Sequence, residues 1–65
     1  MVGQRIKSYL VENGIKQTFL SEKTGIPNPI LSVMLSGGRK INITEYYQIC
    51  KALKVDMQTF VSDED

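Results

Sequence analysis

The segment from Gln17 to Gly37, QTFLSEKTGIPNPILSVMLSG, limits most strongly how this 65-residue chain can fold. Leu20 and Thr24 lie four residues apart, as on one side of a helix. A second apolar stripe with i, i+3, i+4 spacing follows at Leu31, Met34 and Leu35. Gly25 lies between the two stripes, and glycine readily adopts the positive φ that a helix end requires. The segment therefore predicts two short helices joined by a tight turn.

Helix-start signals extend this pattern over the rest of the chain. Pro29 suits the first position of a helix, with Asn28 before it as the N-cap. Asn42 and Glu45 have the spacing of a capping box, and Asp56 is placed to cap a last short helix. We therefore predict an all-α chain with five short helices, over residues 3–13, 17–24, 29–36, 43–53 and 57–62.

Each of the other predicted helices also has an apolar side. It consists of Val2, Ile6, Tyr9 and Leu10 in the first, Ile43, Tyr46, Ile49, Cys50 and Leu53 in the fourth, and Met57, Phe60 and Val61 in the last. A chain this short buries only about 60% of the surface that its unfolded form exposes, so the core is thin and dimerisation would help. We expect residues 1–65 to form one domain, with residues 62–65 frayed.

Charge is distributed unevenly along the chain. The net charge is +1, but residues 63–65 hold three of the seven acidic residues. Residues 1–62 contain eight Lys and Arg residues against four Asp and Glu residues, a net charge of +4. This excess permits binding to a polyanion without demanding it.

The sequence also indicates the cellular compartment in which the protein is expected. No apolar run approaches the ~20 residues of a membrane span, and no signal peptide is visible. A single cysteine cannot form an internal disulfide, which fits a reducing cytoplasm. We therefore expect a cytoplasmic protein that has no membrane partner.

The sequence offers little support for catalytic or metal chemistry. The chain has no histidine, and its one cysteine, Cys50, lies on an apolar helix side, where it fills a core. Glu45 is better explained as a capping residue than as a catalytic acid. Gly37 and Gly38 end a helix and follow no strand, so they do not make a phosphate loop. We expect no enzymatic activity, no cofactor, no metal and no small-molecule substrate.

The order and spacing of the helices resemble the lambda-repressor-like family of Cro/C1-type (XRE) helix-turn-helix DNA-binding domains. The resemblance is carried by the segments GQRIK (3–7), NGIKQ (13–17), LSEKTGI (20–26), LSVMLSG (31–37) and ICKALKVDMQTF (49–60). It implies a five-helix fold in which the second and third helices form the helix-turn-helix. The third helix would then enter the major groove of DNA.

The resemblance also implies which residues contact DNA. Gln17, in the first turn of the second helix, would contact a phosphate and orient the residue that opens the third helix, here Asn28. The resemblance implies that the side chains in the groove are those of Pro29, Ile30, Ser32 and Val33. It implies that the side chains beside the DNA backbone are those of Ser36, Arg39 and Lys40.

The predicted recognition helix departs from the family pattern in its chemistry. Only Asn28 offers an amide that can pair bidentately with adenine, and a role as N-cap would compete for its oxygen. The other outward positions offer a proline, small hydroxyls and the apolar Ile30 and Val33. We expect few base contacts, apolar contact with thymine methyl groups, and a preference set mostly by DNA shape.

Two functions are compatible with these features. The first is a sequence-specific regulator of transcription that binds double-stranded DNA as a homodimer, with the last helix at the dimer contact. The second is a protein-interaction module that keeps the fold and uses the apolar side of the third helix or the last helix. Salt distinguishes them, because phosphate contacts make DNA binding salt-dependent.

Overall fold

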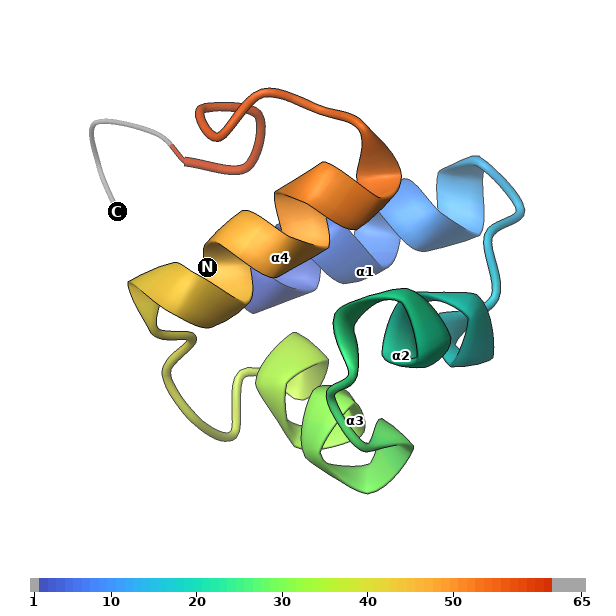
Figure 1. Cartoon of the computed structure of the whole chain (residues 1–65), viewed down its shortest axis with the longest axis vertical. Coiled ribbons are helices and arrows are strands. Elements are labelled where there is room, and N and C mark those ends of the chain that lie inside the picture. Colours follow the sequence, from blue (N-terminus) through green and yellow to red (C-terminus); the bar gives the residue numbers. More distant parts are fainter. Residues whose placement is uncertain (1, 62–65) are drawn as a thin grey trace.

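Four short helices make up the helical structure of residues 2–61, which are the residues that the computed structural model describes (Figure 1). They are α1 (Val2–Glu12), α2 (Gln17–Thr24), α3 (Asn28–Ser36) and α4 (Ile43–Leu53). No strand occurs within these residues, so the prediction of an all-α fold is confirmed. The bounds of α2 and α4 are those predicted, whereas α1 begins and ends one residue earlier and α3 begins one residue earlier.

A fifth helix is not present between residues 57 and 61. Residues 57–60 form turns instead. The Asp56 carboxylate accepts a hydrogen bond from the Gln58 N–H at 3.1 Å, and the Asp56 carbonyl accepts one from the Thr59 N–H at 3.0 Å. The Phe60 N–H then donates to the Tyr46 hydroxyl at 3.4 Å. This tertiary hydrogen bond thus uses the Phe60 N–H, which in a fifth helix would donate to a carbonyl of that helix. Residue 62, the predicted end of this helix, and the predicted frayed tail of residues 62–65 lie outside the described residues.

Of the three predicted N-caps, Asp56 precedes turns and no helix, while Asn42 and Asn28 have opposite outcomes. Asn42 caps α4 in a complete capping box, in which its side chain accepts from the Glu45 N–H at 2.8 Å and Glu45 accepts from the Asn42 N–H at 3.1 Å. Asn28, in contrast, is the first residue of α3, and its predicted role as N-cap is wrong. Pro27 is the N-cap, because its carbonyl accepts the Leu31 N–H at 2.9 Å.

The turn between α2 and α3 depends on Gly25, which has φ of 76°. Its N–H donates to the Ser21 carbonyl at 2.9 Å, and the Ser21 hydroxyl donates to the Ile26 carbonyl at 2.6 Å. A residue with a Cβ is strained in this left-handed conformation. Gly25 therefore lets the chain reverse within three residues and start α3 against α2.

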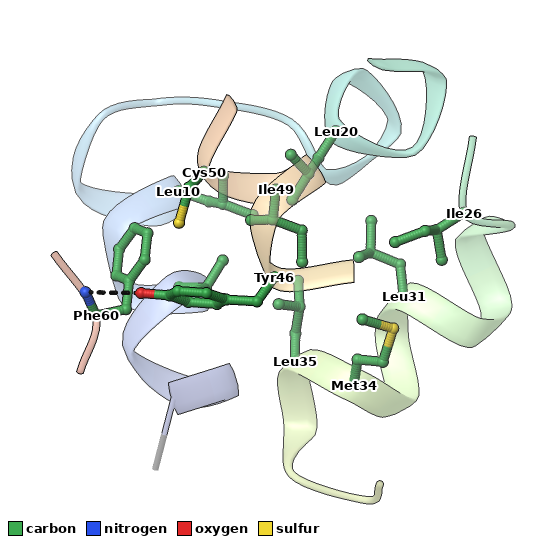
Figure 2. Packing of buried hydrophobic residues seen from close by; sticks show 11 residues of the cluster. Leu10, Leu20, Ile26, Leu31, Met34, Leu35, Tyr46, Ile49, Cys50 and Phe60 are labelled. Carbon is green, nitrogen blue, oxygen red and sulfur yellow. Dashed lines mark hydrogen bonds between the residues drawn. The ribbon is translucent and has the colours of Figure 1, made fainter. Parts of the chain in front are cut away.

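The hydrophobic core lies where the four helices meet (Figure 2). Its buried members are Ile6, Leu10, Leu20, Ile26, Leu31, Met34, Leu35, Tyr46, Ile49, Cys50 and Phe60. Ile43 was predicted to join them but is 72% exposed. Helical side chains tilt toward the N-terminus, so the side chain of Ile43, the first residue of α4, extends past the end of the packed layer.

The C-terminal turns are held by Phe60, which is 3% exposed. Its ring packs edge-on against Tyr9 and Tyr46, with centroid separations of 5.4 and 6.5 Å. The Tyr46 hydroxyl donates to the Met57 carbonyl, and Arg5 donates to the Phe60 carbonyl at 3.3 Å. Figure 2 shows the bond between the Tyr46 hydroxyl and the Phe60 nitrogen. A residue of α4 therefore fixes the path of the segment after it.

Because Tyr46 and Cys50 are buried, the free energy of unfolding should vary with pH in the alkaline range. Burial, together with a hydrogen bond to Cys50, raises the pKa of Tyr46 above its ordinary value of 10.0, and burial also raises the pKa of Cys50. Above pH 9–10 the unfolded chain therefore loses these protons before the folded chain does. The free energy of unfolding should be constant below about pH 9 and fall as pH rises through the folded-state pKa values.

Denaturant titrations between pH 7 and 11 measure this dependence. Tyr46→Phe should be less stable at pH 7, because it loses the hydrogen bonds of the Tyr46 hydroxyl, but its stability should fall less steeply with pH. Tyr47→Phe is the matched control, since Tyr47 is 52% exposed, and it should keep the wild-type slope. An unchanged slope in Tyr46→Phe would contradict the assignment.

Candidate nucleic-acid interface

α3 exposes one side along its whole length. The side chains of Leu31, Met34 and Leu35 are buried in the core. The exposed residues are those that the sequence predicted to face outward, namely Asn28, Pro29, Ile30, Ser32, Val33 and Ser36. Of these, Ile30 and Val33 are large apolar side chains with 41% and 44% exposure. The register predicted for this helix is therefore confirmed.

The Gln17 side chain joins the first turn of α2 to α3. Its Nε2 lies 2.8 Å from Asn28 Oδ1, 2.7 Å from Ser32 Oγ and 3.4 Å from the Asn28 carbonyl oxygen. The resemblance implied that Gln17 orients Asn28, and this contact is present. Ser32 is a further partner, one helical turn along, that the sequence did not predict. The amide of Gln17 thus fixes the position of two exposed α3 residues.

Hydrogen-bond capacity limits what Gln17 can do toward DNA. A glutamine amide nitrogen has two hydrogens, and the two shortest contacts, to Asn28 and Ser32, use both. Gln17 can then offer a phosphate only its carbonyl oxygen, which is an acceptor. In this arrangement, the side chain of Gln17 braces α3, and a phosphate would need other donors.

Such donors lie next to Gln17. The first N–H groups of a helix have no intrahelical carbonyl, and α2 has no side-chain N-cap. The Phe19 N–H donates to the Lys16 carbonyl at 3.1 Å, which leaves the N–H groups of Gln17 and Thr18. They point toward the space where an anion can bind, at the positive end of the helix dipole. Lys16, the residue before α2, is exposed beside them. Lys16 was not among the predicted site residues, although a cation directly before a helix start is a signal that could have identified it.

Asn28 keeps a free donor group. Its Oδ1 accepts from Gln17, while its Nδ2 has no hydrogen-bond partner within residues 2–61. An amide oxygen has two lone pairs, so Oδ1 can accept a second hydrogen bond. The brace therefore leaves Asn28 one donor group and one acceptor position, which is what pairing with adenine requires.

The hydroxyl of Ser36, which is exposed at the other end of α3, is hydrogen-bonded within the helix. Its hydroxyl donates to the Val33 carbonyl at 3.0 Å. A serine has one hydroxyl hydrogen, so this bond leaves Ser36 only as an acceptor. Phosphate oxygens are also acceptors, so a Ser36–phosphate bond requires the hydroxyl to rotate.

The loop after α3 carries the two cations that the resemblance placed beside the DNA backbone. Arg39 Nη2 lies 2.5 Å from Glu45 Oε2, and Arg39 Nη1 donates to the Lys40 carbonyl at 3.2 Å. Lys40 is exposed and forms no ion pair within residues 2–61. Lys40 is thus unpaired in this part of the chain, whereas Arg39 must share its guanidinium with Glu45.

These groups lie at the two ends of the same helix. Lys16 and the first turn of α2 adjoin the start of α3 through Gln17, and Arg39 and Lys40 follow its last turn (Figure 1). The exposed side of α3 therefore has groups that can donate hydrogen bonds to an anion at both of its ends.

Neither a metal site nor a membrane-spanning element is found among residues 2–61. No three His, Cys, Asp or Glu side chains gather there in a way that could hold an ion. Cys50, the single cysteine, is buried. None of the helices described has the length and apolar character needed to cross a bilayer.

Comparison with protein families identifies the fold. A family model described as helix-turn-helix matches residues 6–60, which is most of the chain. The chain belongs to the Cro/C1-type (XRE) helix-turn-helix family. This is a family of DNA-binding transcription regulators rather than of enzymes. No curated protein and no solved structure gives a significant match.

The bracing role of Gln17 can be measured without DNA. In a double-mutant cycle, Gln17→Ala and Asn28→Ala should show a coupling of about 0.5–1 kcal/mol in the free energy of unfolding, the size of an ordinary hydrogen bond. Asn28→Asp keeps the acceptor oxygen and places a negative charge at a helix start, so its stability should equal or exceed that of the wild type. Additive effects of the two alanine substitutions in denaturant titrations would rule out the brace.

Proposed function

We propose that this chain of the Cro/C1-type family is a sequence-specific regulator of transcription, of the repressor type, that binds double-stranded DNA with α3 in the major groove. The observation that carries the proposal is the exposed side of α3, braced by Gln17 and flanked at both ends by phosphate donors. Family membership supports the same function. A regulator of this kind needs no cofactor.

In the proposed complex the predicted site residues have distinct roles. The groove would be occupied by Asn28, Pro29, Ile30, Ser32 and Val33. Lys40 and Arg39 would bind phosphates beyond the end of α3, joined by Ser36 after its hydroxyl rotates. Gln17 would act mainly through Asn28, while the N–H groups of its own helix turn bind the phosphate.

Asn28 is the residue we assign to direct reading of a base. Its free Nδ2 can donate to adenine N7 while Oδ1 accepts from adenine N6, with Gln17 still in place. Asn28→Asp removes the donor and adds a negative charge to the groove. The variant should therefore fold normally and lose most of its affinity for DNA.

A homodimer is proposed on the basis of apolar surface outside α3. A hollow of about 580 Å³ is lined in part by Val2, Ile41, Ile43 and Val61, and Ile43 and Val61 are 72% and 50% exposed. Met57, which was expected in the contact, is half-buried. A thin core gains from burial of this kind. Arg39 and Lys40 line the same hollow and must stay open to DNA. We propose that a second copy covers only its apolar part, at Ile43 and Val61, so that turns and the start of α4, not a fifth helix, form the contact.

The alternative function, a protein-interaction module, is favoured by one observation. Ile30 and Val33 expose apolar surface where a DNA-binding helix more often carries polar side chains. Salt distinguishes the two functions, because counterion release makes DNA affinity fall linearly in a plot of log affinity against log salt concentration. An apolar protein contact responds little to salt.

The salt test has a specific prediction for each cation. Lys40→Ala should weaken binding to all DNA sequences alike and reduce the salt slope by about one unit. Arg39→Ala should have a smaller effect, because Glu45 shares the guanidinium. Lys51→Ala, on α4, is the control and should match the wild type. A change in sequence preference with Arg39→Ala and no change in slope would mean that Arg39 reads a base.

Selection of bound DNA from a random pool tests the function and the dimer together. A dimer with two-fold symmetry should enrich palindromes whose half-sites lie one helical turn, about 34 Å, apart. Ile43→Glu places a charge in the proposed dimer contact and should lower affinity for the palindrome while leaving the fold intact. An enriched site without symmetry, bound by one copy, would contradict the dimer.

A further inference from the structure

The polar side chains on the exposed side of α3 are already hydrogen-bonded within the protein. Ser32 accepts from Gln17, Ser36 donates to the Val33 carbonyl, and the Asn28 oxygen accepts from Gln17. α3 carries no charged residue, and Pro29 has no N–H. The side-chain donors left without a partner on α3, in the described part of the chain, are thus Asn28 Nδ2 and the hydroxyl hydrogen of Ser32.

The remaining exposed groups of α3 are apolar and rigid. Ile30 and Val33 lie three residues apart, so they are neighbours on one side of the helix. Both are β-branched, and such side chains have one strongly preferred χ1 rotamer in a helix. Val33 Cγ1 also packs close to Gly38, where a Cβ would approach it to 2.9 Å. Their methyl groups therefore occupy fixed positions before any partner binds.

Thymine is the base that matches such a surface. In the major groove A, G and C present hydrogen-bond donors and acceptors, whereas thymine adds a 5-methyl group. Contact between that methyl and Ile30 or Val33 removes apolar surface from water on both sides. We propose that Val33 and Ile30 are specificity determinants that recognise thymine methyl groups, so that the preferred sites are rich in thymine opposite this part of α3. This inference rests on the proposed function, since it requires α3 to enter the major groove.

Charge favours DNA over an apolar protein as the occupant. Exposed cations lie at both ends of α3, Lys16 before α2 and Arg39 and Lys40 after α3. Arg39 is paired with Glu45, but an apolar protein partner would have to leave Lys16 and Lys40 beside its own surface without compensation. The DNA major groove instead offers phosphates on both walls and methyl groups on its floor.

The test removes methyl groups from each partner in turn. The probe is a duplex that the wild type selects from a random pool, with each thymine replaced singly by deoxyuridine, which lacks only the 5-methyl. At the contacted positions the wild-type affinity should fall about fourfold per methyl group. Val33→Ala should bind the thymine duplex less tightly and lose most of its sensitivity to deoxyuridine at one position. Ile30→Ala should do the same at a neighbouring position.

Two control variants distinguish a loss of thymine recognition from a loss of folding. Val33→Thr keeps the branched shape but replaces a methyl by a hydroxyl, so it should fold normally and discriminate less between thymine and deoxyuridine. Val11→Ala, at a valine that is 73% exposed on α1, should keep the full discrimination. Loss of discrimination in Val11→Ala would overturn the assignment to α3.

The outcomes separate this inference from the proposed function. Tight, salt-dependent binding that is the same for thymine and deoxyuridine at every position would overturn the methyl-reading role alone. A chain that selects no DNA from the pool would overturn the proposed function and this role with it. Equal deoxyuridine sensitivity in the wild type, Val33→Ala and Ile30→Ala would show that other residues contact the methyl groups.

Discussion

The orientation of the exposed side of α3 depends on the buried contact that its other side makes with the rest of the domain. Leu31, Met34 and Leu35 are at most 1% exposed, so any rotation of α3 would bring apolar surface into water. Gly3 lets α1 approach α3 closely, since a Cβ there would lie 2.2 Å from the Met34 carbonyl oxygen. The position of the outward side chains is therefore set by packing, before any hydrogen bond is considered.

Hydrogen bonding then decides which outward side chains remain free to bind a partner. Gln17 uses its two amide hydrogens on Asn28 and Ser32, which makes the two exposed residues more rigid but removes donors from the surface. A rigid recognition surface loses less conformational entropy on binding. What stays available is one amide group, the hydroxyl hydrogen of Ser32 and the apolar surface of Ile30 and Val33. The hydrogen bonds from Gln17 that position Asn28 and Ser32 thus leave the exposed side of α3 largely apolar.

The sequence predicted what depends on local chemistry and missed what depends on distant contacts. The capping box at Asn42, the turn at Gly25 and the register of α3 each follow from neighbouring residues, and all three are confirmed. The turns at residues 57–60 arise because Tyr46, fourteen residues from Phe60, binds that backbone. Asn28 is the first residue of α3 and not its N-cap, and its contact with Gln17, eleven residues away, was expected only from the family resemblance. None of these partners is visible in local periodicity.

Glu45 connects the stability of the fold with the proposed DNA surface. One carboxylate oxygen accepts the Asn42 N–H in the capping box, and the other binds Arg39. A phosphate that replaced Glu45 as the partner of Arg39 would leave the capping bond intact, because the two oxygens act separately. The exchange breaks one partly exposed ion pair, worth about 0–1 kcal/mol, and forms a new contact with a phosphate. The fold therefore keeps Arg39 in place without holding it too strongly to bind DNA.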